Sequence, residues 1–323
     1  MRFATYAHQH RTRVAVVEAD GTLYPLPGIA SLTDLLRSGG GLPALLDAGA
    51  AALDVPPGPH VSQVRVLPPL QPSSVRDFVT FEEHVEGVRK AVDGVAGVPE
   101  QWYAAPTFYF TNPHAVFGPQ DDIPMPPGSA ALDYELEVAA VIGREGHDLT
   151  PEQARDHIIG YTVFNDWSAR DLQSAEMKVG LGPCKGKDTA TTLGPYLVTP
   201  DELEPYRAAD GFLRLALTAE VNGQVICTDM LSNMSWTFEE MTAYASRGTR
   251  VVPGDVLGSG TCGNGGCLAE LWGLRGEQTP PPLRPGDTVT LTVEGLGTVA
   301  NTVVTGAAPI ALPAGRRRAR ERP

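Results

Sequence analysis

The sequence is poor in basic residues and has no long apolar run. Its 323 residues include 25 lysines and arginines against 38 aspartates and glutamates, which gives a formal net charge of −13. An acidic surface repels nucleic-acid phosphates and anionic lipids, so we expect no nucleic acid and no membrane among the partners. No window reaches the roughly 20 apolar residues of a membrane-spanning helix, and residues 1–18 lack the apolar core of a signal peptide.

Cysteines are also few. The four, Cys184, Cys227, Cys262 and Cys267, are scattered through a long chain, which favours free thiols and a cytoplasmic location. Cys262 and Cys267 bracket a CGNGGC segment that resembles half of a zinc knuckle. Because no second Cys or His pair stands at zinc spacing, we expect no structural zinc.

Glycine and proline, by contrast, are abundant, with 35 and 29 residues, and indicate many turns. Residues 1–72 have the pattern of short strands, with a hairpin turn at Asp20-Gly21, and predict a small N-terminal β-rich domain. Residues 73–313 would form a second, larger domain, and we expect the arginine-rich residues 314–323 to be a disordered tail. The predicted fold class is α+β and rich in strands.

Two capping boxes predict helix starts, because their first and fourth residues can satisfy amides that the first turn leaves free. Thr80 and Glu83 would begin a helix over FEEHVEGVRKAV, and Ser168 and Asp171 one over SARDLQSAEM. An Asn222-Gly223 turn predicts a hairpin within residues 212–230.

The segment LDYELEVAAVIG, residues 132–143, carries two carboxylates in an otherwise apolar strand. Glu135 and Glu137 are two residues apart, so both point to the same face of the strand. If that face is buried, these glutamates and Asp166, at the end of another apolar strand, need a cation to offset the cost of burial. An all-oxygen site favours Mg²⁺, Ca²⁺ or Mn²⁺ over zinc. If the face is wet, the glutamates are simply solvated, and periodicity alone leaves both interpretations open.

Four segments, in this order, resemble the fumarylacetoacetate hydrolase family: LDYELEVAAVIG, IIGYTVFNDWSARDLQ, LGPCKGKDTATTLGPYLVTPDEL and GDVLGSGT. The resemblance covers about residues 73–305, and its NDWSARD and GKDTATTLGP motifs are long and specific. It implies that residues 73–313 are a metal-dependent catalytic domain, a mixed β-sandwich or β-roll of the type found in the family's C-terminal domain. It also implies a homodimer, and it favours the buried metal site over the wet strand face.

The matching positions imply particular roles. The metal ligands would be Asp77, Glu135, Glu137 and Asp166, holding Mg²⁺, with Ca²⁺ or Mn²⁺ as alternatives. His84 would activate water, Glu270 would orient that histidine, and Lys187 would complete the catalytic group. The substrate-binding positions would be Tyr109, Arg170, Gln173, Thr191 and Thr261.

The resemblance implies a metal-dependent hydrolase that cleaves a carbon–carbon bond in a 1,3-diketone or an acylpyruvate-type 2-oxo acid, as in aromatic catabolism. The alternative is a lyase or isomerase of the same superfamily, acting as a 2-oxo acid decarboxylase, hydratase or tautomerase. A non-catalytic, metal-stabilised scaffold is disfavoured, because His84 and Lys187 accompany all four ligand positions.

Three departures from the family pattern argue against fumarylacetoacetate itself as the substrate. Val79 stands where fumarylacetoacetate hydrolase has a substrate-contacting tyrosine. Asn112-Pro113 stands where other relatives have Lys-Pro, and no arginine matches the family's lid segment near residues 93–98.

Overall fold

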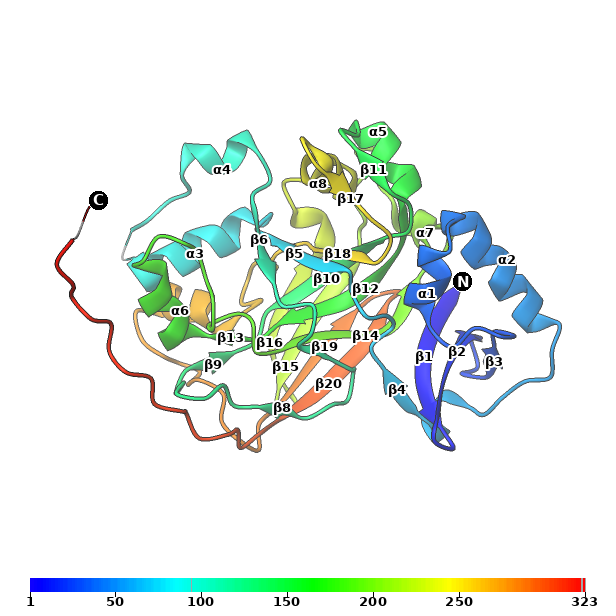
Figure 1. The fold of residues 1–323 in the computed structure, drawn as a ribbon, viewed down its shortest axis with the longest axis horizontal. Coiled ribbons are helices and arrows are strands. Elements are labelled where there is room, and N and C mark those ends of the chain that lie inside the picture. The colour runs from blue at the N-terminus through cyan, green and yellow to red at the C-terminus, as the bar shows by residue number, and fades with distance from the viewer. Residues whose placement is uncertain (94, 321, 323) are drawn as a thin grey trace.

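The computed structural model describes residues 1–93, 95–320 and 322, with the side chains of residues 91–93 left out, and is built around a large mixed sheet (Figure 1). The strand order of this sheet is β3 (Leu23–Pro25), β2 (Arg11–Val17), β1 (Arg2–His8), β14 (Thr191–Val198), β12 (Ile158–Asp166), β10 (Leu136–Ile142), β18 (Asp255–Gly258), β5 (Ser74–Phe78) and β6 (Phe108–Thr111). Two short strands join it from the side: β4 (Arg65–Leu67) pairs with β1, and β7 (Val116–Phe117) pairs with β14.

A smaller sheet packs against one face of the large sheet. Its order is β16 (Gln224–Met230), β15 (Ala216–Val221), β19 (Thr288–Val293), β20 (Gly297–Val304) and β8 (Ile123–Pro124). The strands β15 and β16 form the predicted hairpin, with Asn222 and Gly223 both at positive φ in the turn. Buried side chains of the small sheet, such as Leu217 and Leu291, share one core with Val138 of β10.

Strand β10 is buried on both faces. Its Val138 and Ala140 face the small sheet, whereas Ala139 and Val141 pack into a second core with the N-terminal strands and helices. A strand covered on both sides reads as a continuous apolar run rather than an alternating one. This double burial therefore excludes the wet strand face considered for the glutamates.

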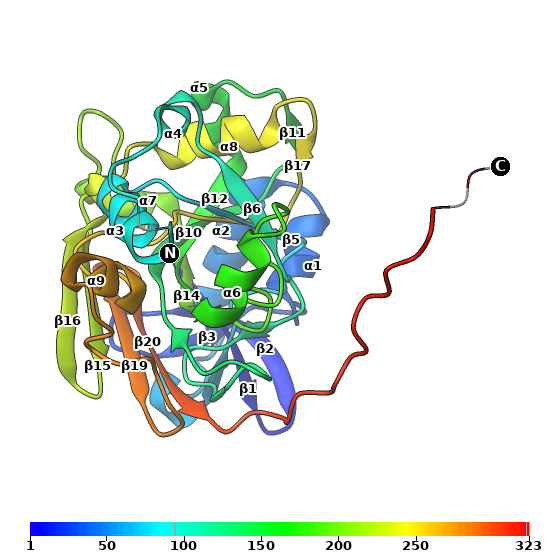
Figure 2. The ribbon, with the colours of Figure 1, turned by 90° about the vertical axis from the view of Figure 1, so that its left-hand side faces the viewer.

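Helices surround the two sheets. In Figure 2, α3 and α9 lie together on one side of the large sheet. The α-helices are α1 (Leu32–Arg37), α2 (Gly41–Leu53), α3 (Glu82–Asp93), α4 (Glu100–Ala104), α5 (Pro151–Ala154), α6 (Arg170–Met177), α7 (Pro200–Leu203), α8 (Phe238–Ser246) and α9 (Leu268–Arg275). The 3₁₀ turns are η1 (Val61–Gln63), η2 (Arg155–His157), η3 (Glu204–Tyr206) and η4 (Leu231–Asn233). Two small ribbons pair β9 (Leu132–Asp133) with β13 (Ser168–Ala169), and β11 (Gly146–His147) with β17 (Arg250–Val251). None of the described helices is long and apolar enough to cross a membrane.

The predicted helices exist, but the two capping boxes do not begin them. Helix α3 starts at Glu82, and the hydroxyl of Thr80 donates to the carbonyl of Ser259 at 2.6 Å. Helix α6 starts at Arg170, so the prediction that Ser168 caps it is wrong. Ser168 instead pairs with Asp133, because its backbone forms part of the two-stranded β9–β13 ribbon. The hydroxyl of Ser168 donates to the carbonyl of Asp166.

The predicted α+β, strand-rich fold class is confirmed. The division near residue 72 stays a prediction, because β1 joins β14 in the large sheet while β1–β3 also enclose a small core of their own. Residues 307–320 and 322 lie outside helices and strands and are exposed. Glu321 and Pro323 of the predicted tail, and Gly94 in the lid segment, lie outside the described residues.

Candidate metal centre and active site

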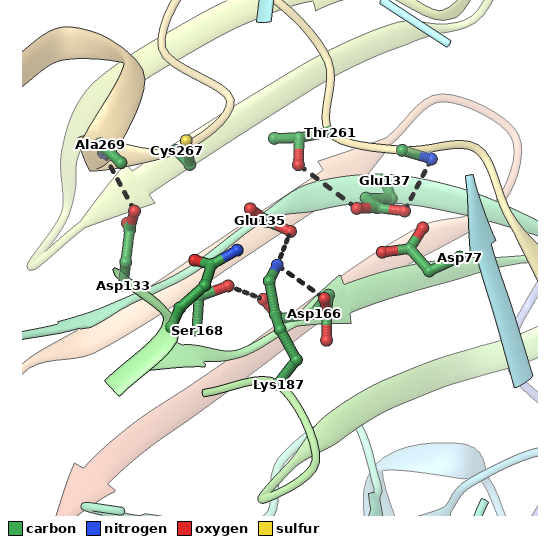
Figure 3. Close-up of polar contacts among 12 residues, drawn as sticks. Asp77, Asp133, Glu135, Glu137, Asp166, Ser168, Lys187, Thr261, Cys267 and Ala269 are labelled. Carbon is green, nitrogen blue, oxygen red and sulfur yellow. Dashed lines mark hydrogen bonds and ion pairs between the residues drawn. The ribbon is translucent and has the colours of Figure 1, made fainter. Parts of the chain in front are cut away.

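Four buried carboxylates meet where the central strands of the large sheet end (Figure 3). Asp77 comes from β5, Glu137 from β10 and Asp166 from the last position of β12, while Glu135 lies in the break between β9 and β10. Their exposed fractions are 2% for Asp77, 3% for Glu135, 1% for Glu137 and 0% for Asp166. Carboxylate oxygens of Asp77, Glu135 and Glu137 lie within 4.8 Å of one another. The structure thus brings together all four predicted metal ligands.

The four carboxylates differ in how much positive charge lies beside them. Burial, and then the charge of Asp166, raise the pKa of Asp77 well above its ordinary value. Burial, and then the charge of Asp77, do the same to the pKa of Glu137. Burial also acts to raise the pKa of Glu135, but the charges of Lys187 and Arg170 outweigh it and lower this pKa to about 2. The Asp77–Glu137 side of the cluster is therefore where positive charge is most lacking.

The residues present fit a hard divalent cation. Among the described residues, the Oδ1 atoms of Asp77 and Asp166 are buried without any hydrogen-bond partner, an arrangement that costs free energy unless something binds there. Gly258 pairs with both Asp77 and Ala139 and leaves the space open, since a Cβ at this position would lie 2.7 Å from Asp77 Oδ1. Carboxylate oxygens are the ligands that Mg²⁺, Mn²⁺ and Ca²⁺ prefer.

Addition of Mg²⁺ or Mn²⁺ should raise the melting temperature of the protein. A cation that binds only the folded state stabilises it by about 2.7 kcal/mol when its free concentration is 100 times the dissociation constant. Differential scanning fluorimetry with a cation titration, followed by excess EDTA, measures this directly. Sodium chloride at matched ionic strength is the control. A melting temperature that changes with neither the cation nor the chelator would argue against the site.

Lys187 and Tyr109 donate into the carboxylate cluster. The Nζ of Lys187 lies 2.7 Å from Asp166 Oδ2 and also donates to Glu135 Oε2. Burial works to lower the pKa of Lys187, but the charges of Asp166 and Glu135 raise it overall, so the ammonium stays charged. The hydroxyl of Tyr109 donates to Asp77 Oδ2 at 2.9 Å and bonds Asp166 as well. Both predicted residues therefore place donors beside the carboxylate oxygens of the cluster.

His84 and Glu270 form a buried pair at the edge of the cluster. His84 Nδ1 lies 3.5 Å from Glu270 Oε2, while Glu270 Oε1 accepts from the amide of Gly265 at 2.9 Å. His84 comes from α3 and Glu270 from α9, and Gly87 allows the two helices to approach closely, since a Cβ there would lie 2.5 Å from Glu270 Cγ. Potential ligand atoms of His84 and Glu135 lie within 4.8 Å of one another, so the pair is directly beside the carboxylates.

The predicted substrate-binding residues surround the same cluster. Arg170 is 7% exposed, and its guanidinium donates to Asp133, to Glu135 and, at 3.1 Å, to Gln173. The hydroxyl of Thr261 lies 3.3 Å from Glu137 Oε1. Thr191 is buried and pairs with Asp166 across β12 and β14.

Two residues of this site were not predicted from the sequence. Cys267 Sγ lies 3.8 Å from His84 Nδ1 and accepts from the amide of Glu270 as the cap of α9. Asp133 is fully buried and accepts from Arg170 and, as Figure 3 shows in part, from the first amides of α9. Asp133 is two residues before Glu135, so the same alternation that paired Glu135 with Glu137 could have indicated it.

Replacement of Asp133 by asparagine should destabilise the protein by about 3 kcal/mol or more, because it leaves the buried Arg170 with one counter-charge fewer and turns an amide donor toward the N–H groups of α9. Urea unfolding measures the loss. Asp47→Asn, on an exposed position of α2, is the matched control. Equal urea midpoints for the two variants would show that the contacts of Asp133 do not stabilise the fold.

The family model described as the fumarylacetoacetate hydrolase C-terminal domain matches residues 73–304. The chain belongs to this family. The match spans the carboxylates, His84, Glu270 and Lys187, so the whole cluster lies within the family's domain.

Members of the family differ in their named activities. The human mitochondrial oxaloacetate tautomerase FAHD2A is 30% identical over 271 residues, which cover 80% of this chain and 78% of that protein. A fumarylacetoacetate hydrolase from Exiguobacterium antarcticum is 27% identical, with a TM-score of 0.72 over 94% of this chain and 99% of that one. A 5-carboxymethyl-2-hydroxymuconate delta-isomerase from Mycobacterium smegmatis is also 27% identical, with a TM-score of 0.67 over 94% and 100% of the two chains. The family membership supports an enzyme, while the choice among these reactions depends on the site.

Proposed function

We propose that this chain is a metal-dependent hydrolase that cleaves the carbon–carbon bond of an acylpyruvate-type 2-oxo acid or a 1,3-diketone. The observation that carries the proposal is the buried His84–Glu270 pair beside the carboxylate cluster. A histidine held by a carboxylate at one ring nitrogen is set up to accept a proton at the other.

The residues divide the work. Asp77, Glu135, Glu137 and Asp166 would hold Mg²⁺, with Mn²⁺ or Ca²⁺ as alternatives, and the bound cation supplies Lewis-acid polarisation of substrate oxygens. His84 Nδ1 lies 3.5 Å from Glu270 Oε2, so His84 would take the proton of the attacking water at its other ring nitrogen, Nε2. Lys187 and Tyr109 supply donors for the negative charge that develops on oxygen, and Arg170 with Gln173 orients the substrate carboxylate.

A tautomerase of a 2-oxo acid is the second candidate. The named activity of FAHD2A, at 30% identity and similar coverage of both chains, supports it. The same His84 could then move a proton between carbon and oxygen of one substrate, and no water would be consumed.

Product analysis separates the two candidates. Acetylpyruvate and oxaloacetate are incubated with the Mg²⁺-loaded protein, and products are followed by NMR. Equimolar acetate and pyruvate from acetylpyruvate, each product pair consuming one water, supports the hydrolase. Faster enol–keto exchange of oxaloacetate without cleavage of acetylpyruvate supports the tautomerase. Release of CO₂ from oxaloacetate as the only reaction would contradict both.

The homodimer and the cytoplasmic location belong to the same proposal, since both come from the family resemblance and the free cysteines. Light scattering after size-exclusion chromatography tests the first. A mass near twice the 34.3 kDa of the chain is expected, and a mass of one chain would contradict it.

A further inference from the structure

A largely apolar pocket of about 340 Å³ opens beside His84. Its walls include Val79, Val85, Val88, Pro99 and Trp102, together with His84 in the first turn of α3. Its volume is at the lower end of the range for small-molecule pockets in proteins, which are mostly apolar with a few polar groups.

The pocket adjoins the proposed reaction site at His84. Val79 directly follows β5, two residues after Asp77. His84 both lines the pocket and lies beside Glu135. A substrate held at the carboxylates with its scissile carbonyl near His84 would therefore direct its far end past Val79 into the pocket.

The wall of the pocket is fixed in place. Trp102 is 5% exposed, and its Nε1 donates to the carbonyl of Val79 at 2.6 Å, which ties α4 to the end of β5. The ring of Tyr103 lies edge-on to that of Trp102, with centroids 4.9 Å apart. An indole held in this way presents a preformed apolar surface rather than one that must be ordered on binding.

The pocket offers little to a second carboxylate. Its two basic side chains are engaged elsewhere, because the guanidinium of Arg89 donates to the carbonyl of Gly97 and His84 faces Glu270. The remaining walls are valine, proline and tryptophan, with Gln101 and Thr107 as the two uncharged polar residues. Contact between apolar surface of this kind and a hydrocarbon group favours binding. Contact with a charged group disfavours binding, because the charge loses its hydration.

We propose that this pocket binds an apolar acyl substituent of the substrate. The inference rests on the proposed function, and it deepens that function by naming the substrate class: acylpyruvates with a hydrocarbon acyl group of about four to eight carbons, linear, branched or aromatic. A substrate with a second carboxylate, such as fumarylpyruvate, and a substrate as short as oxaloacetate leave the pocket unused.

A chain-length series tests the proposal. Each buried methylene adds about fourfold to binding in the transition state, so kcat/KM should rise at least thirtyfold from acetylpyruvate to hexanoylpyruvate. Succinylpyruvate, which ends in a carboxylate, should fall well below hexanoylpyruvate. Equal rates across the series, or a preference for succinylpyruvate, would overturn the proposal.

Two variants locate the effect. Val79→Tyr fills the pocket and should remove the chain-length preference. Val225→Tyr, at a 55% exposed position of β16, should leave the preference intact. Val88→Trp narrows the pocket from α3 instead and serves if Val79→Tyr does not fold. A preference that survives both pocket variants would place the acyl group elsewhere.

Binding without turnover separates this proposal from the proposed function. Calorimetry of the Mg²⁺-loaded protein should show 2-oxooctanoate binding at least tenfold more tightly than pyruvate, and Val79→Tyr should abolish the difference. Failure to cleave any acylpyruvate would refute the hydrolase alone, because this difference would still support the pocket. Equal affinities for the two acids would refute the pocket even if acetylpyruvate is hydrolysed.

Discussion

Asp77→Asn should abolish the cation-dependent rise in melting temperature and lower kcat/KM on the order of 10³-fold, which corresponds to several kcal/mol of lost charge stabilisation. Asp77 is 2% exposed, and its Oδ1 is buried without a hydrogen-bond partner among the described residues, so this oxygen is directly available to a cation. An amide of the same shape removes the charge and turns a donor toward that position.

The same substitution should stabilise the cation-free protein. Its Nδ2 would lie near the carboxylate of Glu137, so a repulsive contact becomes a hydrogen bond. The melting temperature in EDTA should rise by roughly 2–4 °C for each kcal/mol gained. Asp54→Asn, at an exposed position after α2, is the matched control. An Asp77→Asn protein that melts lower in EDTA and still responds to Mg²⁺ would contradict both expectations.

His84→Ala should lower kcat by about 10²–10⁴-fold, the usual contribution of a general base, while the cation-dependent shift in melting temperature stays unchanged. The histidine touches the cluster but is not proposed to hold the cation, so activity and cation binding should separate. Steady-state kinetics on acylpyruvate, together with the fluorimetric titration, measure the two properties on the same preparation.

Glu270→Gln tests the role of the partner. As a positioning residue, Glu270 should affect kcat more than KM. Its loss should also change the shape of the pH profile of kcat, and not only lower the maximum value of kcat. His147→Ala, on a side chain that is 81% exposed, is the control for removal of a histidine. Full activity in His84→Ala would eliminate water activation by this residue and favour chemistry that needs no base there.

The sequence predicted which side chains lie close together better than it predicted their local structure. The spacing of Glu135 and Glu137 and the family motifs were enough to identify the side chains that meet at the cluster. Periodicity alone left their burial open, because it cannot show that β10 is covered by a second sheet on one face and by N-terminal elements on the other.

The errors have the same origin. Ser168 has the local signature of a helix cap, but pairing with Asp133, 35 positions earlier in the chain, draws it into a strand. The contacts of Asp133 could not be predicted, because its partners, Arg170 and the first turn of α9, come from distant segments. The pocket could not be predicted from the sequence either, since α3, α4 and the segment after β5 come together to form its walls only on folding.

The central claim is that the four carboxylates hold a divalent cation. Diffraction from crystals soaked in Mn²⁺, recorded near the manganese absorption edge, tests it most directly. The account predicts one strong anomalous peak among Asp77, Glu135, Glu137 and Asp166, and its loss in Asp77→Asn. An empty cluster at saturating Mn²⁺, with the ammonium of Lys187 still bridging Glu135 and Asp166, would contradict the account.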